Sequence, residues 1–183
     1  MARQLITLDE YKDYASINSI DFDDKLQSIV DKVSNYVKTY CSRTFIDYYD
    51  KNTNEYLNIV EYSNEPEYFY TCEFPINSLV SVEYSADMGN TYTSIPAYFD
   101  KSKDAIFIDS TYSGINAYKI TYTGGYKRTP EDLKLACLDL VDYYYKNESV
   151  PRRTTMNNTV EYITTSDLPS HIKRVLDLYR VLL

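Results

Sequence analysis

The chain has 183 residues, of which 44% are hydrophobic, and its formal net charge at pH 7 is -8. This length and apolar content suffice for a folded domain with a core and exclude a disordered chain. The acidic balance argues against a protein that grips nucleic acid, because phosphate binding needs clustered Lys and Arg. DNA would pass such a surface with little adhesion. No stretch approaches the roughly 20 apolar residues of a membrane span, and no signal peptide is expected.

Tyrosine is unusually frequent in this sequence, with 22 Tyr and no Trp. A tyrosine ring is apolar but ends in a hydroxyl, so it suits surfaces that are wet in one state and buried in another. The alternative is a compositional bias that also favours Asn, Lys and Ile. The sequence leaves both explanations open.

Two helices are predicted near the start of the chain. Thr7 and Glu10 have the spacing of a capping box, which predicts a short helix over 8–15. After a polar break, acidic residues open a longer helix over 24–42. Its apolar positions follow the i, i+3, i+4, i+7 template: Leu26, Ile29, Val30, Val33, Val37, Tyr40 and Cys41.

Residues 45–123 predict an antiparallel sheet inserted between the helices. Short segments rich in Tyr, Val, Ile and Thr alternate there with turn clusters. The candidate strands are Phe45–Tyr49, Glu55–Val60, Tyr68–Cys72, Leu79–Tyr84, Ile106–Ile108 and Tyr118–Thr123.

A glycine turn and a third helix follow the last candidate strand. Gly124 and Gly125 allow the chain to reverse, Thr129 can cap a helix, and that helix is expected over 130–147. One stripe of this helix is apolar: Leu133, Ala136, Cys137, Leu140, Val141 and Tyr144. Leu135 and Leu138 lie off the stripe, which indicates a second packing partner, either the sheet or a neighbouring subunit.

The C-terminal part is predicted to be an arm followed by a helix. The stretch from Asn147 to Ser166 has little periodicity and contains Arg152 and Arg153, which could meet an acidic partner or DNA phosphate or simply be solvated. A last helix opens at Pro169. One side of it is apolar: Ile172, Val175, Leu176, Tyr179 and Leu182. The predicted division is a core over 1–147 and an arm with a docking helix over 148–183.

Four segments together resemble a known family. They are the Thr-Leu-Asp-Glu start with its long helix ending in Tyr-x-x-Arg-Thr-Phe, the segment from Phe74 to Val82, the Thr-Tyr-Thr-Gly-Gly-Tyr turn before Pro-x-x-Leu-Lys, and the closing Leu-Pro helix ending in Leu-x-x-Tyr-Arg. In this order they resemble the head–tail connector (adaptor, or head-completion) proteins of tailed bacteriophages. Residues 45–70 and 85–115 match nothing in particular and look like expansions of the sheet region.

The resemblance implies an α+β fold: a small bundle of about four helices with an inserted antiparallel sheet and an extended C-terminal arm plus helix. It implies a structural virion protein that forms a homo-oligomeric ring, commonly twelve-fold, in the neck of the virion. The ring would bind the portal protein on one side and a tail or stopper protein on the other, and DNA would pass through it. Such a ring would be assembled in the host cytoplasm.

No residue pattern indicates an enzyme. His171 is the only histidine, and it has no evident partner for a catalytic pair or a metal site. Three widely separated cysteines, Cys41, Cys72 and Cys137, predict reduced thiols rather than a disulfide framework or zinc. No cofactor is therefore expected. The alternative function is a β-rich receptor- or carbohydrate-binding module that uses surface tyrosines.

The residues predicted to lie at a subunit or portal interface share an apolar or basic side chain on the third helix, the arm or the last helix. They are Leu135, Leu138, Arg152, Arg153, Ile172, Val175, Leu176 and Tyr179.

Overall fold

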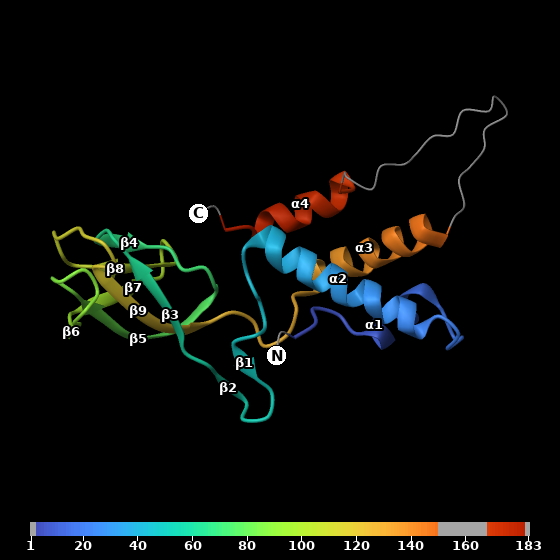
Figure 1. The fold of residues 1–183 in the computed structure, drawn as a ribbon, viewed down its shortest axis with the longest axis horizontal. Helices are drawn as coiled ribbons and strands as arrows, with labels where there is room; N and C mark the ends of the chain where they lie inside the picture. Colours follow the sequence, from blue (N-terminus) through green and yellow to red (C-terminus); the bar gives the residue numbers. More distant parts are fainter. Residues whose placement is uncertain (1–2, 150–167, 182–183) are drawn as a thin grey trace. The chain divides into compact units, whose positions relative to one another are not determined.

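The computed structural model describes residues 3–149 and 168–181, and within them the fold is α+β, with four helices and nine strands in antiparallel sheets (Figure 1). These residues form two compact units. Of the described residues, the helical unit comprises 3–43, 129–149 and 168–181, and the β unit comprises 44–128. The β unit is thus one continuous stretch of chain between two helical stretches, and each unit is described by itself.

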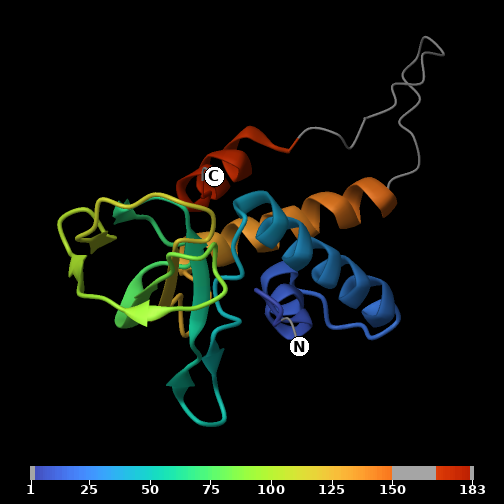
Figure 2. The same ribbon diagram turned by 60° about the vertical axis from the view of Figure 1, so that its left-hand side comes forward.

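The capping box predicted at the start of the first helix is confirmed. In α1 (Leu8–Ala15) the Glu10 amide donates to the Thr7 hydroxyl at 3.2 Å, and the Thr7 amide donates to the Glu10 carboxylate at 2.8 Å. Ser16 ends the helix in the left-handed conformation, with φ of 55°. Tyr11 is its buried residue, and α1 lies against the two long helices of its unit (Figure 2).

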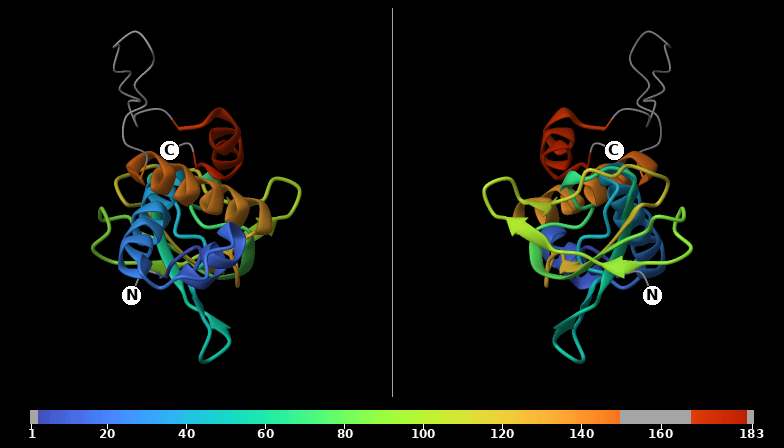
Figure 3. Two further views of the ribbon diagram at one scale, coloured as in Figure 1. Left: turned by 90° about the vertical axis from the view of Figure 1, so that its right-hand side faces the viewer. Right: turned by 90° about the vertical axis from the view of Figure 1, so that its left-hand side faces the viewer.

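The other three helices are α2 (Asp23–Cys41), α3 (Glu131–Ser149) and α4 (Ser170–Tyr179), and they pack against one another (Figure 3). The predicted apolar stripes of α2 and α3 are confirmed as core, and only their tyrosines, Tyr40 and Tyr144, are half-buried. Each helix places its apolar stripe against another helix because the stripe is too wide to remain in water. Ile172 and Leu176 bring α4 into this packing, so it lies with α2 and α3 in the helical unit.

The β unit consists of two small sheets around one core, and a separate two-stranded ribbon. The ribbon pairs β1 (Tyr49–Asp50) with β2 (Glu55–Tyr56). The first sheet has the order β3-β9-β5-β6 and the second β4-β8-β7, all antiparallel. Their bounds are β3 Ile59–Ser63, β4 Glu67–Phe69, β5 Ile76–Tyr84, β6 Thr93–Ser94, β7 Ala97–Asp100, β8 Ala105–Ile108 and β9 Tyr118–Gly124. Their shared core is Ile59, Val82, Ile106, Ile108, Ala117, Tyr118, Ile120 and Tyr122.

Three of the predicted strands are confirmed, because β5, β8 and β9 contain them. The predicted strand Phe45–Tyr49 is wrong over most of its length. Phe45 has a φ of 66°, and its amide donates to the buried carboxylate of Glu73 at 3.1 Å, so the backbone turns there.

The remaining strand predictions are right only in part. The predicted strand Glu55–Val60 is split between β2 and β3, and the predicted strand Tyr68–Cys72 is cut short where β4 ends at Phe69. Strands β6 and β7 are absent from the prediction. These strands are two to five residues long, and such short segments carry little periodic signal.

The glycine turn after β9 is confirmed, and the structure shows why it needs glycine. Gly125 has a φ of 87°, and a Cβ there would lie 2.7 Å from the carbonyl oxygen of Phe45. A Cβ on Gly124 would lie 2.8 Å from the carbonyl oxygen of Glu73. Three segments therefore meet closely at this end of the β unit, and only glycine leaves room for their backbones.

Thr129, which the sequence predicts to cap α3, bonds to a residue outside that helix. Its hydroxyl donates to the carbonyl oxygen of Leu5 at 2.6 Å, and both residues are buried. This bond fixes the segment before α1 to the start of α3, so Thr129 ties two parts of the helical unit together.

Candidate interaction surfaces

One side of α4 is committed to the helical unit. Ile172 and Leu176 are 1% and 0% exposed. The Cys41 thiol donates to the Leu176 carbonyl at 3.5 Å, and the amide of Val181 donates to the Cys41 carbonyl at 3.1 Å. The end of α2 and the end of α4 are thus joined by backbone and side-chain bonds as well as by apolar contact.

Tyrosine hydroxyls bonded to aspartates connect the helices at four places. Tyr40 on α2 donates to Asp177 on α4, and Tyr179 on α4 donates to Asp132 on α3, both at 2.6 Å. Two further bonds, at 2.6 and 3.4 Å, join α1 to α3: Tyr14 to Asp139 and Tyr11 to Asp142. Each hydroxyl donates to a carboxylate on another helix, so these tyrosines help to hold the unit together.

Two of these tyrosines and one of the aspartates have a shifted pKa. The hydrogen bond to Asp139 raises the pKa of Tyr14, and burial raises that of Tyr11. The ion pair with Lys173 at 2.6 Å and the bond from Tyr40 lower the pKa of Asp177. The phenols of Tyr11 and Tyr14 are therefore held protonated and the Asp177 carboxylate charged, which are the states in which a phenol donates and a carboxylate accepts.

The opposite side of α4 faces solvent and is basic with one apolar residue. His171, Arg174 and Leu178 are exposed, and Leu178 is 76% exposed. Residues spaced by three and four positions share a helix face, so these three lie in one row, beside the half-buried Val175. We call this row the α4 outer face. Its spacing is readable in the sequence, but the apolar stripe on the other side of the helix gave the stronger signal.

The structure separates the predicted interface residues into three groups. Ile172, Leu176 and Leu138 are buried in the helical unit, the last at 8% exposure. Leu135 on α3 is 51% exposed, while Val175 and Tyr179 are half-buried. Arg152 and Arg153 lie outside the described residues, as does Leu182 of the predicted α4 stripe. Leu135 and the rim of α4, by which we mean Val175 and Tyr179, are thus the predicted positions that remain accessible on the described helical unit.

Two shallow pockets lie along α3. One, of about 560 Å³, has α1 on its other side and is lined by Tyr11, Tyr14, Ala15, Ile17, Asp142, Tyr145 and Lys146. The other, of about 340 Å³, has α4 on its other side and is lined by Asp139, Asp142, Tyr143, Lys146, Pro169, His171 and Ile172. Asp142 is paired with Lys146 at 2.7 Å, so the acid common to both pockets already has a cation.

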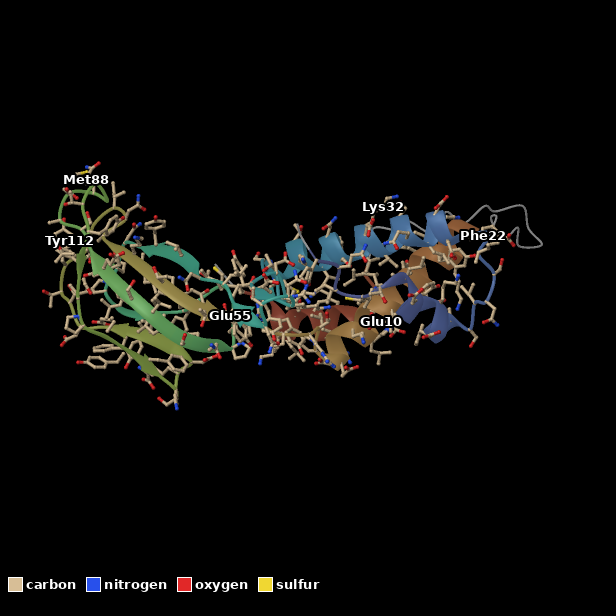
Figure 4. All side chains as sticks on the ribbon, turned by 90° about the horizontal axis from the view of Figure 1, so that it is seen from below. Glu10, Phe22, Lys32, Glu55, Met88 and Tyr112 are labelled. Carbon is tan, nitrogen blue, oxygen red and sulfur yellow. The ribbon has the colours of Figure 1, made fainter. Side chains whose placement is uncertain are left out.

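The β unit carries many exposed apolar side chains. Figure 4 shows Met88 and Tyr112 at one end of this unit and Glu55 on its ribbon. In the second sheet the register places Tyr68, Phe107 and Tyr98 side by side across three strands. The rings of Tyr68 and Phe107 are 5.2 Å apart and tilted by 51°.

The groups that could carry chemistry are either buried or isolated. Cys41 and Cys137 are buried, and burial raises their thiol pKa values to about 11 and about 12. The side chain of His171 is 70% exposed, and its nearest carboxylate, on Asp139, is 4.0 Å away. Among the described residues, no three His, Cys, Asp or Glu side chains form a group that could hold a metal. None of the four described helices has the length and apolar run needed to cross a bilayer.

The described residues thus form a helical unit and a β unit, and each has exposed apolar side chains. The family model for head completion proteins matches residues 4–182. The chain therefore belongs to the head completion protein family, which is a family of structural phage proteins and not of enzymes.

One sequence relative is a head completion protein itself. The head completion protein of Escherichia phage T5 is 41% identical over 63 residues, which are 33% of this chain and 37% of that protein. The chain thus matches little more than a third of that relative's length.

Two solved structures share the fold at low sequence identity. A chain from the virion of a native gene transfer agent (GTA) particle has a TM-score of 0.55 at 12% identity, covering 98% of this chain and 91% of that one. A chain from the neck of the native GTA particle, computed with C12 symmetry, has a TM-score of 0.54 at 11% identity, covering 100% and 96%.

Proposed function

We propose that this protein is a structural subunit of the virion neck, where copies of it form a ring between the portal and the tail. The observation that carries the proposal is the family match over residues 4–182, since it spans both units. The fold shared with a chain from a GTA neck computed with C12 symmetry supports a ring, and twelve subunits is the number we propose.

We also propose that the subunit has the architecture predicted from sequence, a helical bundle with an inserted sheet region. A ring built from identical subunits needs two different surfaces on each copy, so that each contact leads to the next and the ring closes. The α4 outer face and Leu135 are candidates for such surfaces on the helical unit. The exposed apolar side chains of the β unit supply others.

The partners we propose are the portal protein, a tail or stopper protein, and a second copy of the chain. DNA would pass through the ring without sequence-specific binding, because a net charge of -8 gives the phosphates little to bind. The C-terminal segment, including Arg152 and Arg153, would take part in docking to the portal or to an adjacent subunit.

Electron microscopy of the purified chain, alone and mixed with the portal protein of the same phage, tests this proposal. We expect closed rings, free or attached to the portal. A chain that stays monomeric in both samples at micromolar concentration contradicts the proposal. Specific binding of glycans by such a monomer would favour the alternative, a carbohydrate-binding module.

The contribution of the α4 outer face is tested with the double variant Arg174→Glu, Leu178→Ser. Both side chains are exposed, so the helical unit should keep its stability within about 0.5 kcal/mol. Portal binding or ring formation should weaken at least tenfold if this face is used. Lys32→Glu, an exposed position on α2 that Figure 4 labels, is the matched control for charge reversal. Equal loss in the control would show that general charge, and not this face, matters.

A further inference from the structure

The first sheet of the β unit ends in a strand whose second edge is open. Strand β3 (Ile59–Ser63) pairs with β9 along its whole length, and within the described residues no strand lies on its other side. Val60 and Tyr62, which point away from the core, are 45% and 53% exposed. An open edge of this kind presents backbone groups that can pair with another strand.

The edges at β4 and at β6 carry features that discourage pairing, and β3 lacks these features. Strand β4 follows Pro66 and begins at Glu67, which has a φ of 71°. Strand β6 has two residues, and Pro96 stands between it and β7. Proline and irregular backbone interrupt strand addition, whereas β3 contains no proline or lysine.

Glu61, the one charged residue of β3, is not placed to discourage strand addition at this edge. The Glu61 carboxylate accepts hydrogen bonds from the Tyr122 hydroxyl and from the Cys72 amide, at 3.2 Å for the latter. These bonds turn the charge toward the interior of its own unit. The side chains that an added strand would meet on the outer side are therefore those of Val60 and Tyr62.

A segment of this chain has the sequence of a strand of this sheet. The triplet Val-Glu-Tyr occurs at residues 60–62 in β3, at 82–84 in β5 and again at 160–162. The first two copies are strands that flank β9 on either side. Residues 159–165, Thr-Val-Glu-Tyr-Ile-Thr-Thr, are β-branched or aromatic with the exception of Glu161, a composition typical of strands.

This segment lies outside the described residues, within 150–167. That stretch has more residues than are needed to connect the end of α3 to the start of α4. His171, at the start of α4, is 4.0 Å from Asp139. From Asp139 to the end of α3 at Ser149 is about 15 Å along the helix, at about 1.5 Å per residue. Residues 150–167 can span roughly 60 Å when extended, at about 3.4 Å per residue. The chain between α3 and α4 therefore has enough length to reach another molecule.

Charge also favours this pairing. In an antiparallel addition with Val160 to Tyr162 beside β3, the chain before the triplet runs past Ser63 toward the turn that leads into β4. Glu65 and Glu67 lie there, and both are exposed. Arg152 and Arg153 are the basic residues that would arrive on this side, opposite in sign to the two glutamates.

We propose that residues 159–165 of one copy add as a strand to the open edge of β3 in a second copy. The inference rests on the self-association proposed above and specifies one contact of it. Backbone hydrogen bonds would supply affinity, and contacts with Val60 and Tyr62 would fix the register.

Hydrogen exchange on the full-length chain, assembled and dissociated by dilution, tests the strand addition. We expect the β3 amides that do not bond to β9 to exchange at least tenfold more slowly in the assembly. Val160→Pro removes a donor from the added strand and should restore fast exchange at β3. Asn157→Pro, in the same stretch but outside the strand-like segment, is the control and should leave the protection in place.

The outcomes separate the inference from the proposed function. An assembly that forms with unprotected β3 amides, or with protection that survives Val160→Pro, overturns the strand addition and leaves the ring. If the β3 amides are equally protected at all dilutions, residues 159–165 pair with β3 of their own copy. This result also overturns the proposed strand addition between two copies. A chain that never assembles overturns the proposed function and this inference with it.

Discussion

Four tyrosines of the helical unit have a structural role, which accounts for part of the high tyrosine content of the sequence. Tyr11, Tyr14, Tyr40 and Tyr179 each bond to an aspartate on another helix. A phenylalanine would fill the same space but leave the carboxylate without this donor. Tyrosine therefore gives a small helical unit polar ties at its edges in addition to apolar burial.

Tyr40→Phe should destabilise the contact of α4 with α2 by about 0.5–1.5 kcal/mol, the usual net value of one hydrogen bond. The bond lost is the 2.6 Å bond to Asp177. Chemical denaturation of the purified variant measures the change. Tyr36→Phe, one turn earlier on α2, keeps the bond to Asp177 and is the control. Equal midpoints for wild type and Tyr40→Phe would show that the bond contributes nothing.

The buried thiols should be unreactive and should limit stability at alkaline pH. Burial raises the pKa values of Cys41 and Cys137 to about 11 and about 12. Because the folded state prefers the protonated thiols, their contribution to stability is complete below pH ~9 and is lost as pH rises from there through these values. At pH 8 a thiol reagent should modify the half-buried Cys72 first. Modification of all three at one rate in the native protein would contradict this.

At the scale of elements, α4 has one side that packs in the helical unit and one side that is exposed. The sequence predicted one apolar stripe that needed a partner. In the structure Ile172 and Leu176 of that stripe are buried where α4 packs against α2 and α3. A helix of this length is marginal alone in water, so it depends on this packing. The docking role of α4 remains a prediction and now concerns its outer face and rim.

Ile172→Ala should cost about 2–5 kcal/mol, because the side chain is 1% exposed and its removal leaves a cavity. Leu178→Ala, at a position 76% exposed on the same helix, is the matched control and should change stability by about 0.5 kcal/mol or less. Thermal or urea unfolding of the dissociated chain measures both. Similar small effects would mean that α4 is ordered by assembly and not by its own unit.

At the scale of the whole molecule, each of the two units buries apolar side chains. The helical unit buries Leu133 and Leu140 among its helices, and the β unit buries Ile106 and Ile120 between its sheets. The side chains of the β-unit core all belong to that unit. We therefore expect the two units to respond separately to damage.

Leu140→Ala and Ile120→Ala test this separation. Each removes a side chain that is 0% exposed and should cost its own unit about 2–5 kcal/mol. Hydrogen exchange should accelerate in α2 and α3 for the first variant and in β5 and β9 for the second. If either variant accelerates exchange throughout the described residues to the same extent, the units unfold as one.

The sequence by itself determined the helices and the family. Capping residues, glycines and apolar periodicity act over a few neighbouring positions, so local pattern alone suffices to assign the roles of Thr7, Glu10 and Gly125. The family match over residues 4–182 bears out the resemblance carried by short motifs.

Tertiary structure decided what local pattern could not. The buried carboxylate of Glu73, far along the chain, turns the backbone at Phe45 where the pattern predicted a strand. Partner helices likewise decided that Ile172 and Leu176 of the predicted stripe are buried, whereas Val175 and Tyr179 are only half-buried. Both outcomes depend on which distant residues arrive at a position, and periodicity records only that an apolar side chain needs a partner, not which one it meets.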